Sequence, residues 1–146
     1  MKQMLIQSAV LICLSAVAAW VGYALHPRAP SLYAVAPEIA ADEVTVQQVM
    51  ERWRDRVIWL DARPREQYLM DHIPGARLLN EQEFEAQLLD LLEELERADR
   101  PVIIYCSGQK CDASRHVRER LIASVPLDDC YILHGGWPAW KASHQP

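Results

Sequence analysis

The sequence predicts an α/β domain in which a central parallel sheet is flanked by helices. Three apolar runs of strand length, at residues 57–60, 102–105 and 131–133, alternate with segments of helical periodicity, and residues 76–79 form a fourth strand candidate. Short runs that are apolar throughout are typical of strands covered on both faces. Because the strands alternate with helices, we expect them to lie parallel in one sheet.

Helices are predicted where apolar residues recur three and four positions apart. The first begins at Thr45, whose side chain can cap it together with Gln48. Its expected core-facing residues are Val46, Val49, Met50 and Trp53. Pro64 suits the first position of a short helix that runs to Leu69.

Two longer helices follow. The residues that mark the inner face of the first are Phe84, Leu88, Leu91, Leu92 and Leu95. Its other face is rich in Asp and Glu, and we interpret it as a solvated surface. The second is expected at 113–124. Its core-facing residues would be Val117, Leu121 and Ile122.

The N-terminal segment is apolar, and no Lys, Arg, Asp or Glu lies between Lys2 and Arg28. A helix over residues 4–25 would be long enough for a hydrocarbon core of about 30 Å. We therefore expect residues 1–26 to be a membrane anchor. A cleavable signal peptide is the alternative, since residues 16–18 are small. The Pro- and Ala-rich residues 27–43 would link it to a domain at residues 44–143.

An uncleaved anchor predicts a single-pass protein of the plasma (inner) membrane with its domain on the exported, periplasmic side. Cleavage would instead give a secreted protein. The flanking charges discriminate weakly between the two orientations, because Lys2 lies on one side and Arg28 on the other.

Composition limits the possible partners and cofactors. The 146 residues fit one domain with a net charge of −5, and no basic stripe with interleaved aromatic residues predicts binding to nucleic acid. The four cysteines are Cys13, Cys106, Cys111 and Cys130. Their spacing matches neither a disulfide scaffold nor a zinc site, so we expect no metal. No organic cofactor is expected either, because the family resemblance described below implies that the protein itself carries the transferred group.

Cys106 is the candidate nucleophile. It follows the apolar run 102–105 and precedes a short polar loop that opens a helix. This arrangement points backbone N–H groups and a positive helix end at the sulfur, which favours the thiolate. Asp61 also ends a predicted strand, at the sheet edge where functional groups gather. The alternative is that Cys106 is an inert cysteine packed at the end of a strand.

Four segments together resemble the single-domain rhodanese family in their order and spacing. They are Asp61-Ala62-Arg63 with Tyr68, His72-Ile73-Pro74-Gly75-Ala76, Tyr105-Cys106 with its glycine-containing loop, and Gly135-Gly136-Trp137-Pro138-Ala139-Trp140. The resemblance covers about residues 44–142 and implies a rhodanese-like three-layer domain. It also implies a sulfurtransferase that takes sulfane sulfur from a thiosulfate-type anion or a persulfide and passes it to a thiol or a cyanide-type acceptor.

The resemblance implies roles for individual residues. Cys106 would carry the persulfide, and its loop would form an anion cradle. The cradle residues would be Ser107, Gly108, Gln109, Lys110 and Cys111. Lys110 and Arg115 would add positive charge that lowers the pKa of the thiol, or they are ordinary exposed cations. Asp61 and Arg63 match the family's Asp-x-Arg element, and they either face the mouth of the site or form an internal ion pair.

The sequence departs from the family at Cys111, where many rhodaneses carry an arginine. Loss of the guanidinium disfavours thiosulfate as the donor. Cys111 also suggests a thiol/disulfide redox element, in which it attacks the persulfide and pairs with Cys106. A third hypothesis is a non-catalytic, membrane-tethered interaction or sulfur-carrier module. Related phosphatases need an arginine where this chain has Asp112, which would repel phosphate.

Overall fold

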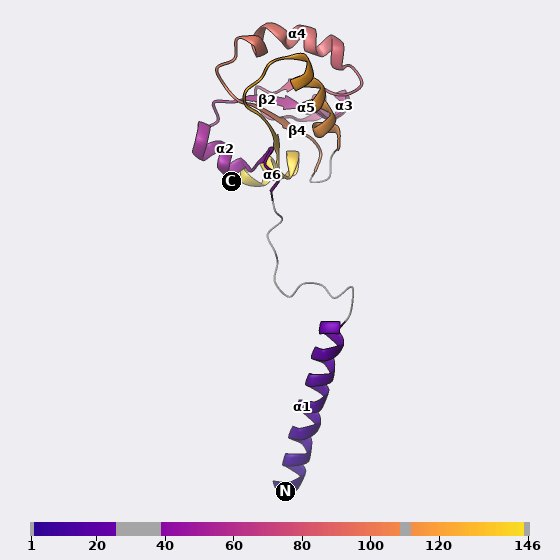
Figure 1. Cartoon of the computed structure of the whole chain (residues 1–146). Coiled ribbons are helices and arrows are strands. Elements are labelled where there is room, and N and C mark those ends of the chain that lie inside the picture. Colours follow the sequence, from indigo (N-terminus) through magenta and orange to yellow (C-terminus); the bar gives the residue numbers. More distant parts are fainter. Residues whose placement is uncertain (1, 26–38, 109–111, 145–146) are drawn as a thin grey trace. The chain divides into compact units, whose positions relative to one another are not determined.

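The computed structural model describes residues 2–25, 39–108 and 112–144 (Figure 1). The chain divides into two units, one that ends at Glu38 and one that begins at Ile39. The described part of the first unit is helix α1 (Lys2–Leu25), and the second unit holds all the strands and the other helices.

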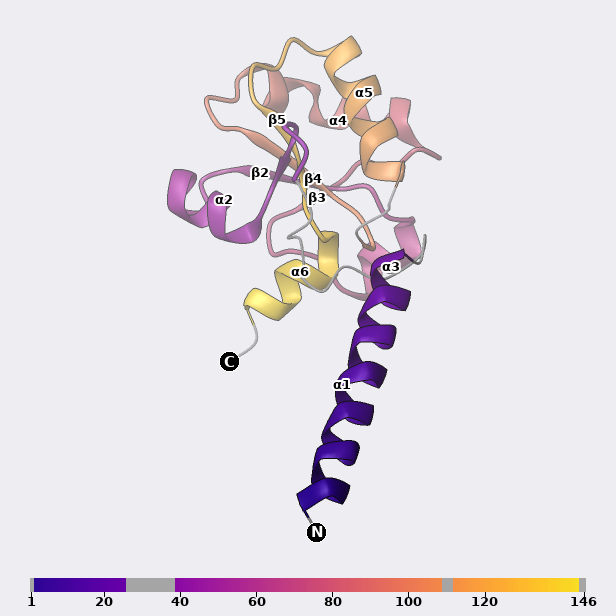
Figure 2. The same ribbon diagram turned by 60° about the horizontal axis from the view of Figure 1, so that its bottom comes forward.

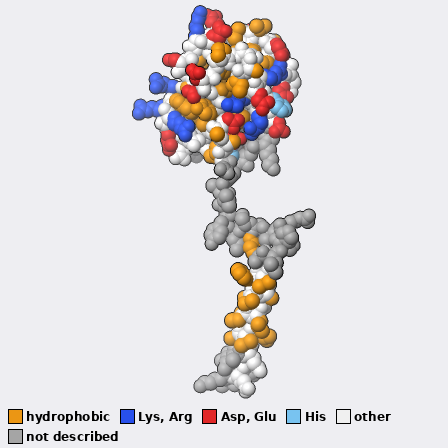
Figure 3. Space-filling model, viewed as in Figure 1, with side chains coloured by type: hydrophobic (Ala, Val, Ile, Leu, Met, Phe, Trp, Pro, Cys, Tyr) orange, Lys and Arg blue, Asp and Glu red, His pale blue; other side chains and the backbone are white. Residues whose placement is uncertain are grey.

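The prediction of a membrane anchor at residues 4–25 is not supported. The segment is helical, and its large apolar side chains, such as those of Leu11 and Trp20, are exposed (Figure 3). A helix that crosses a bilayer needs about 20 consecutive, mainly apolar residues. Within the part of the chain that the structure describes, no helix reaches the required combination of length and apolarity.

The predicted parallel sheet is confirmed in the second unit. Its strands are β1 (Glu43–Val44), β2 (Ile58–Asp61), β3 (Arg77–Leu78), β4 (Val102–Tyr105) and β5 (Cys130–Leu133). All pairs are parallel, and the order across the sheet is β1-β5-β4-β2-β3. In the central pair Asp61 lies opposite Tyr105. Cys106 therefore leaves the sheet at the edge where β2 also ends.

Helices cover both faces of the sheet (Figures 1 and 2). They are α2 (Val46–Trp53), α3 (Arg65–Met70), α4 (Phe84–Glu96), α5 (Asp112–Ser124) and α6 (Gly136–Ser143). Helices α4 and α5 pack on one face, while α2 and α6 pack on the other. Successive strand residues point to opposite faces, so β4 contributes to both cores. Ile104 packs beneath α4 and α5, whereas Ile103 and Tyr105 pack beneath α2 and α6.

Most details of the helix predictions are confirmed. The Thr45 hydroxyl accepts a hydrogen bond from the Gln48 amide at 3.1 Å, and the Gln48 side chain accepts one from the Thr45 amide at 2.9 Å. Two core-facing predictions are wrong: Met50 is 44% exposed and Ile122 is 41% exposed. Each directly follows a buried residue on its helix, Val49 and Leu121 respectively. The buried face of each helix is thus narrower than the apolar face that the sequence spacing predicts.

Cys130 of β5 generates a pH prediction. Its side chain is 5% exposed, and burial raises the pKa of the thiol to about 11 from an ordinary 9.0. The folded state therefore holds the Cys130 proton at pH values at which the unfolded chain releases it. This contribution to stability is complete below pH 9 and is lost as the pH rises through 11.

We expect the free energy of unfolding of the parent protein to fall by roughly 2 kcal/mol more than that of Cys130→Ala between pH 9 and pH 11. Urea unfolding of both proteins at each pH measures this difference. An equal fall in the free energy of unfolding of the two proteins over that interval would contradict the prediction.

Candidate functional site

Cys106 lies between the end of β4 and the start of α5, and only 2% of it is exposed. Its thiol donates a hydrogen bond to the Gly108 carbonyl oxygen at 3.3 Å. The Ser114 hydroxyl donates to the Cys106 sulfur at 3.5 Å. Ser114 belongs to the first turn of α5 and is 1% exposed. The sulfur is thus in contact with its own loop and with the helix that follows.

Part of the predicted anion cradle can be located. Ser107 is exposed and Gly108 is half-buried. Gln109, Lys110 and Cys111 lie outside the described residues, so their predicted roles stay predictions. The Gly108 carbonyl oxygen faces the sulfur. A carbonyl oxygen is a suitable partner for a protonated thiol, because it accepts a hydrogen bond from the S–H group.

The backbone of Cys106 is held by the start of α6. The Trp137 amide donates to the Cys106 carbonyl oxygen at 2.7 Å. Gly136 packs so closely that an added Cβ would lie 2.3 Å from that oxygen, and its φ is +55°. Only glycine tolerates both the left-handed conformation and the close approach. In the sequence the glycine pair 135–136 is recognisable as part of the rhodanese-like pattern, and the structure adds that Gly136 fixes the backbone of Cys106.

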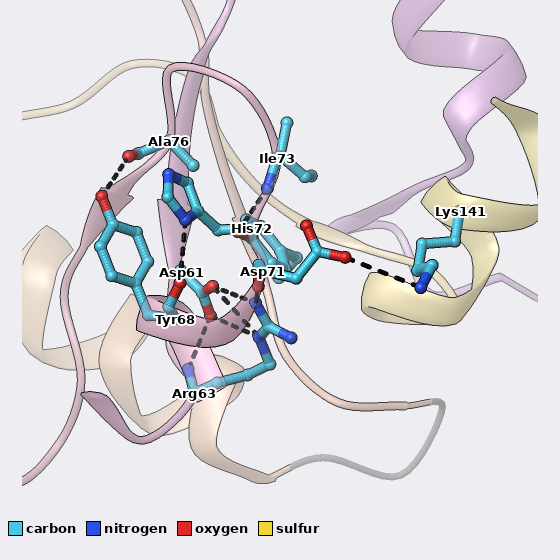
Figure 4. Close-up of polar contacts among 9 residues, drawn as sticks. Asp61, Arg63, Tyr68, Asp71, His72, Ile73, Ala76 and Lys141 are labelled. Atoms are coloured by element: carbon cyan, nitrogen blue, oxygen red, sulfur yellow. Dashed lines mark hydrogen bonds and ion pairs between the residues drawn. The ribbon is translucent and has the colours of Figure 1, made fainter. Parts of the chain in front are cut away.

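Asp61 and Arg63 form a buried ion pair directly beyond β2 (Figure 4). The Arg63 Nη2 atom lies 2.7 Å from Asp61 Oδ2, and Nε donates to both carboxylate oxygens. Nη2 also donates to the Asp71 carbonyl oxygen at 2.6 Å. Asp61 is 0% exposed and Arg63 is 4% exposed. Of the two arrangements that the sequence leaves open, the structure has the internal ion pair.

The guanidinium of Arg63 is enclosed by aromatic rings as well as by the carboxylate. Its central carbon lies 4.7 Å from the Trp137 ring centroid and 5.5 Å from that of Tyr105. Burial by itself lowers the pKa of Arg63, but the hydrogen bonds and negative charge of Asp61 outweigh it and raise the pKa above the usual value. Arg63 therefore keeps its charge and connects β2 to α6.

The loop after α3 is held by hydrogen bonds to backbone groups (Figure 4). The Tyr68 hydroxyl donates to the Ala76 carbonyl oxygen at 2.9 Å, and His72 Nδ1 lies 2.9 Å from the Tyr68 carbonyl oxygen. The Ile73 amide donates to the hydroxyl of Tyr105 at 3.2 Å, and burial raises the pKa of that phenol. His72 thus has a structural role in this loop.

Arg115 takes part in ion pairs at β1. Its guanidinium lies 3.6 Å from Asp42 Oδ2 and 3.4 Å from Glu43 Oε1, and its side chain is 47% exposed. Glu43 also lies 2.8 Å from His134 Nδ1. These carboxylates offset the charge of Arg115, and the expected effect of that charge on the Cys106 thiol stays a prediction.

The close contact at Gly136 predicts a large cost for Gly136→Ala. Gly75→Ala is a matched control, because Gly75 also has a positive φ of +81° but no atom within 4 Å of an added Cβ. We expect the control to lose about 1–2 kcal/mol of unfolding free energy from backbone strain. Gly136→Ala should lose at least about 2 kcal/mol more from the clash. Urea unfolding measures the loss of unfolding free energy in both variants. Equal losses would contradict the predicted clash at Gly136.

Neutralising Asp61 should destabilise the fold. Asp61→Asn leaves the buried Arg63 charge without its counter-ion, which costs roughly 3–5 kcal/mol. The matched control is Glu93→Gln, because Glu93 pairs with Arg97 on the surface, where both side chains are more than 70% exposed. The control should leave the unfolding free energy nearly unchanged. Similar unfolding midpoints for the two variants would show that the buried pair contributes little.

Comparisons with known proteins agree with this architecture. The model of the rhodanese-like domain family matches residues 45–143. Over 110 residues the chain is 33% identical to the HTH-type transcriptional regulator Rv0324 of Mycobacterium tuberculosis, covering 72% of this chain and 44% of the regulator. The chain thus spans less than half the length of that relative.

Solved structures show the same fold. A rhodanese-like domain protein from Staphylococcus aureus is 25% identical with a TM-score of 0.52, covering 68% of this chain and 90% of that one. Thiosulfate sulfurtransferase from Pseudomonas aeruginosa is 23% identical with a TM-score of 0.56, covering 81% of this chain and 20% of that one. With a family match over nearly the whole second unit, the chain belongs to the rhodanese-like domain family.

Proposed function

We propose that the protein is a sulfurtransferase that carries sulfane sulfur as a persulfide on Cys106. The observation that carries the proposal is the position of Cys106, at the end of the central strand and beside the first turn of α5. Family membership supports it, because sulfur transfer is a common activity of rhodanese-like domains. No metal or organic cofactor is needed, since the protein itself carries the sulfur.

The reaction consists of two displacements at sulfur. In the first, the Cys106 thiolate attacks the outer sulfur of the donor. A Cys106 S–S bond forms, and the donor's own S–S bond breaks with release of its remaining half as an anion, such as sulfite or a thiolate. In the second, an acceptor thiolate or cyanide attacks the outer sulfur and the Cys106 thiolate leaves. Two electron pairs move in each step, and no external oxidant or reductant is consumed.

A persulfide is the better candidate donor than thiosulfate. Arg63 is occupied by Asp61 and Asp71, and Arg115 pairs with acidic residues at β1. Neither is a free fork for the sulfonate group of thiosulfate, and the chain has Cys111 where many rhodaneses have arginine. A persulfide donor makes a smaller demand on positive charge.

A second candidate is a sulfur-carrier or interaction module without turnover. The similarity to part of a protein described as a transcriptional regulator favours it, because a regulator can act without turning over a substrate. The burial of Cys106 also favours it, because a buried sulfur is poorly accessible to a donor molecule. Pairing of Cys106 with Cys111 as a redox element remains a third proposal.

Mass spectrometry of the protein after incubation with glutathione persulfide, and separately with thiosulfate, distinguishes these functions. We expect the mass of one sulfur atom to be gained at Cys106 and to be lost on addition of cyanide or a thiol. Cys106→Ser should abolish the gain.

Cys130→Ala is the control for this experiment, because Cys130 is a second buried cysteine of the same domain. It should gain sulfur at Cys106 as the parent does. Gain without discharge would favour the carrier module, and an internal disulfide would favour the redox element. Sulfur found on Cys130 but not on Cys106 would overturn the proposal.

A further inference from the structure

We infer that the Ser114 hydroxyl stabilises the Cys106 thiolate and so controls both displacements at sulfur. This inference deepens the proposed sulfur transfer and assigns Ser114 a role that nothing in the sequence pattern assigned to it. Ser114 touches the reacting atom itself, through an O–H that donates to the Cys106 sulfur at 3.5 Å.

The contact is shielded from water. Cys106 is 2% exposed and Ser114 is 1% exposed. Cys106 directly follows β4, and Ser114 lies in the first turn of α5. A hydrogen bond is electrostatically stronger in such a site than in solvent. A negative charge on the sulfur therefore strengthens the Ser114 hydrogen bond more here than it would in solvent.

The hydrogen bonds that the sulfur makes with Gly108 and Ser114 respond differently to ionisation. The bond to the Gly108 carbonyl oxygen uses the thiol proton and disappears when the proton leaves. The Ser114 bond has the sulfur as acceptor, so it persists and becomes charge-assisted. Ser114 therefore contributes more to the thiolate than to the thiol.

The same distinction applies along the reaction. In the persulfide, the negative charge lies on the outer sulfur, one bond away from the atom that Ser114 contacts. The charge lies on the Cys106 sulfur when it attacks the donor and again when it leaves during discharge. A hydrogen-bond donor at this atom assists loading by increasing the fraction of Cys106 that is ionised at pH values where the thiol is still partly protonated. It assists discharge by stabilising the thiolate that leaves.

The test is site-resolved alkylation of Cys106 by iodoacetamide as a function of pH, in the parent and in Ser114→Ala. Loss of a charge-assisted hydrogen bond should move the midpoint of the pH–rate profile upward by about 1 unit. Well below the midpoint, this corresponds to alkylation about 10-fold slower in the variant. At high pH, where both proteins are ionised, the rates should agree within a few-fold.

The matched control is Ser124→Ala on the same helix. Ser124 is exposed, and its hydroxyl donates to the Arg120 carbonyl oxygen at 2.8 Å, so its removal should leave the profile unchanged. Ser114→Cys provides a second variant of similar size, with a weaker donor than the hydroxyl, and it should also raise the midpoint. An unchanged midpoint in either folded Ser114 variant would overturn the inference.

Alkylation needs no sulfur donor, so this experiment separates the inference from the proposed function. A shifted midpoint in a protein that never forms a persulfide would retain the Ser114 contact and reject sulfur transfer. Persulfide formation together with an unshifted midpoint would retain sulfur transfer and reject the role of Ser114.

Discussion

The hydrogen bond from the Trp137 amide to the Cys106 carbonyl oxygen is the contact on which the rest of the site depends. It exists because Gly136 brings the start of α6 against the end of β4, at a distance that no Cβ would permit. The backbone of Cys106 is thereby held by the sheet on one side and by α6 on the other. The position of the sulfur follows from backbone geometry.

A second set of contacts holds the neighbouring edge of the sheet. The ion pair of Asp61 and Arg63 lies beyond β2, and Arg63 packs against the rings of Trp137 and Tyr105. The positive charge of Arg63 is therefore paired with groups inside the domain. This arrangement explains how an Asp-x-Arg segment at this edge of the sheet can be structural. In the proposed reaction, the negative charge of a donor would therefore have to be met by other groups.

The sequence predicts the sheet and the candidate nucleophile because both depend on local patterns. Apolar runs identify β2, β4 and β5, and Cys106 is recognised by its place directly after one of them. Strand β1 has only two residues, too few for a periodic signal. The contacts of Gly136 and Ser114 with Cys106 are recognisable only in the fold, which brings the two residues there from 30 and 8 residues further along the chain.

The most direct measurement is a single-turnover experiment with a persulfide donor whose outer sulfur carries an isotopic label. The account predicts that the label reaches Cys106 and that cyanide then removes it as labelled thiocyanate, one atom for each atom loaded. Label that bypasses Cys106, or thiocyanate formed equally well by Cys106→Ser, would contradict it.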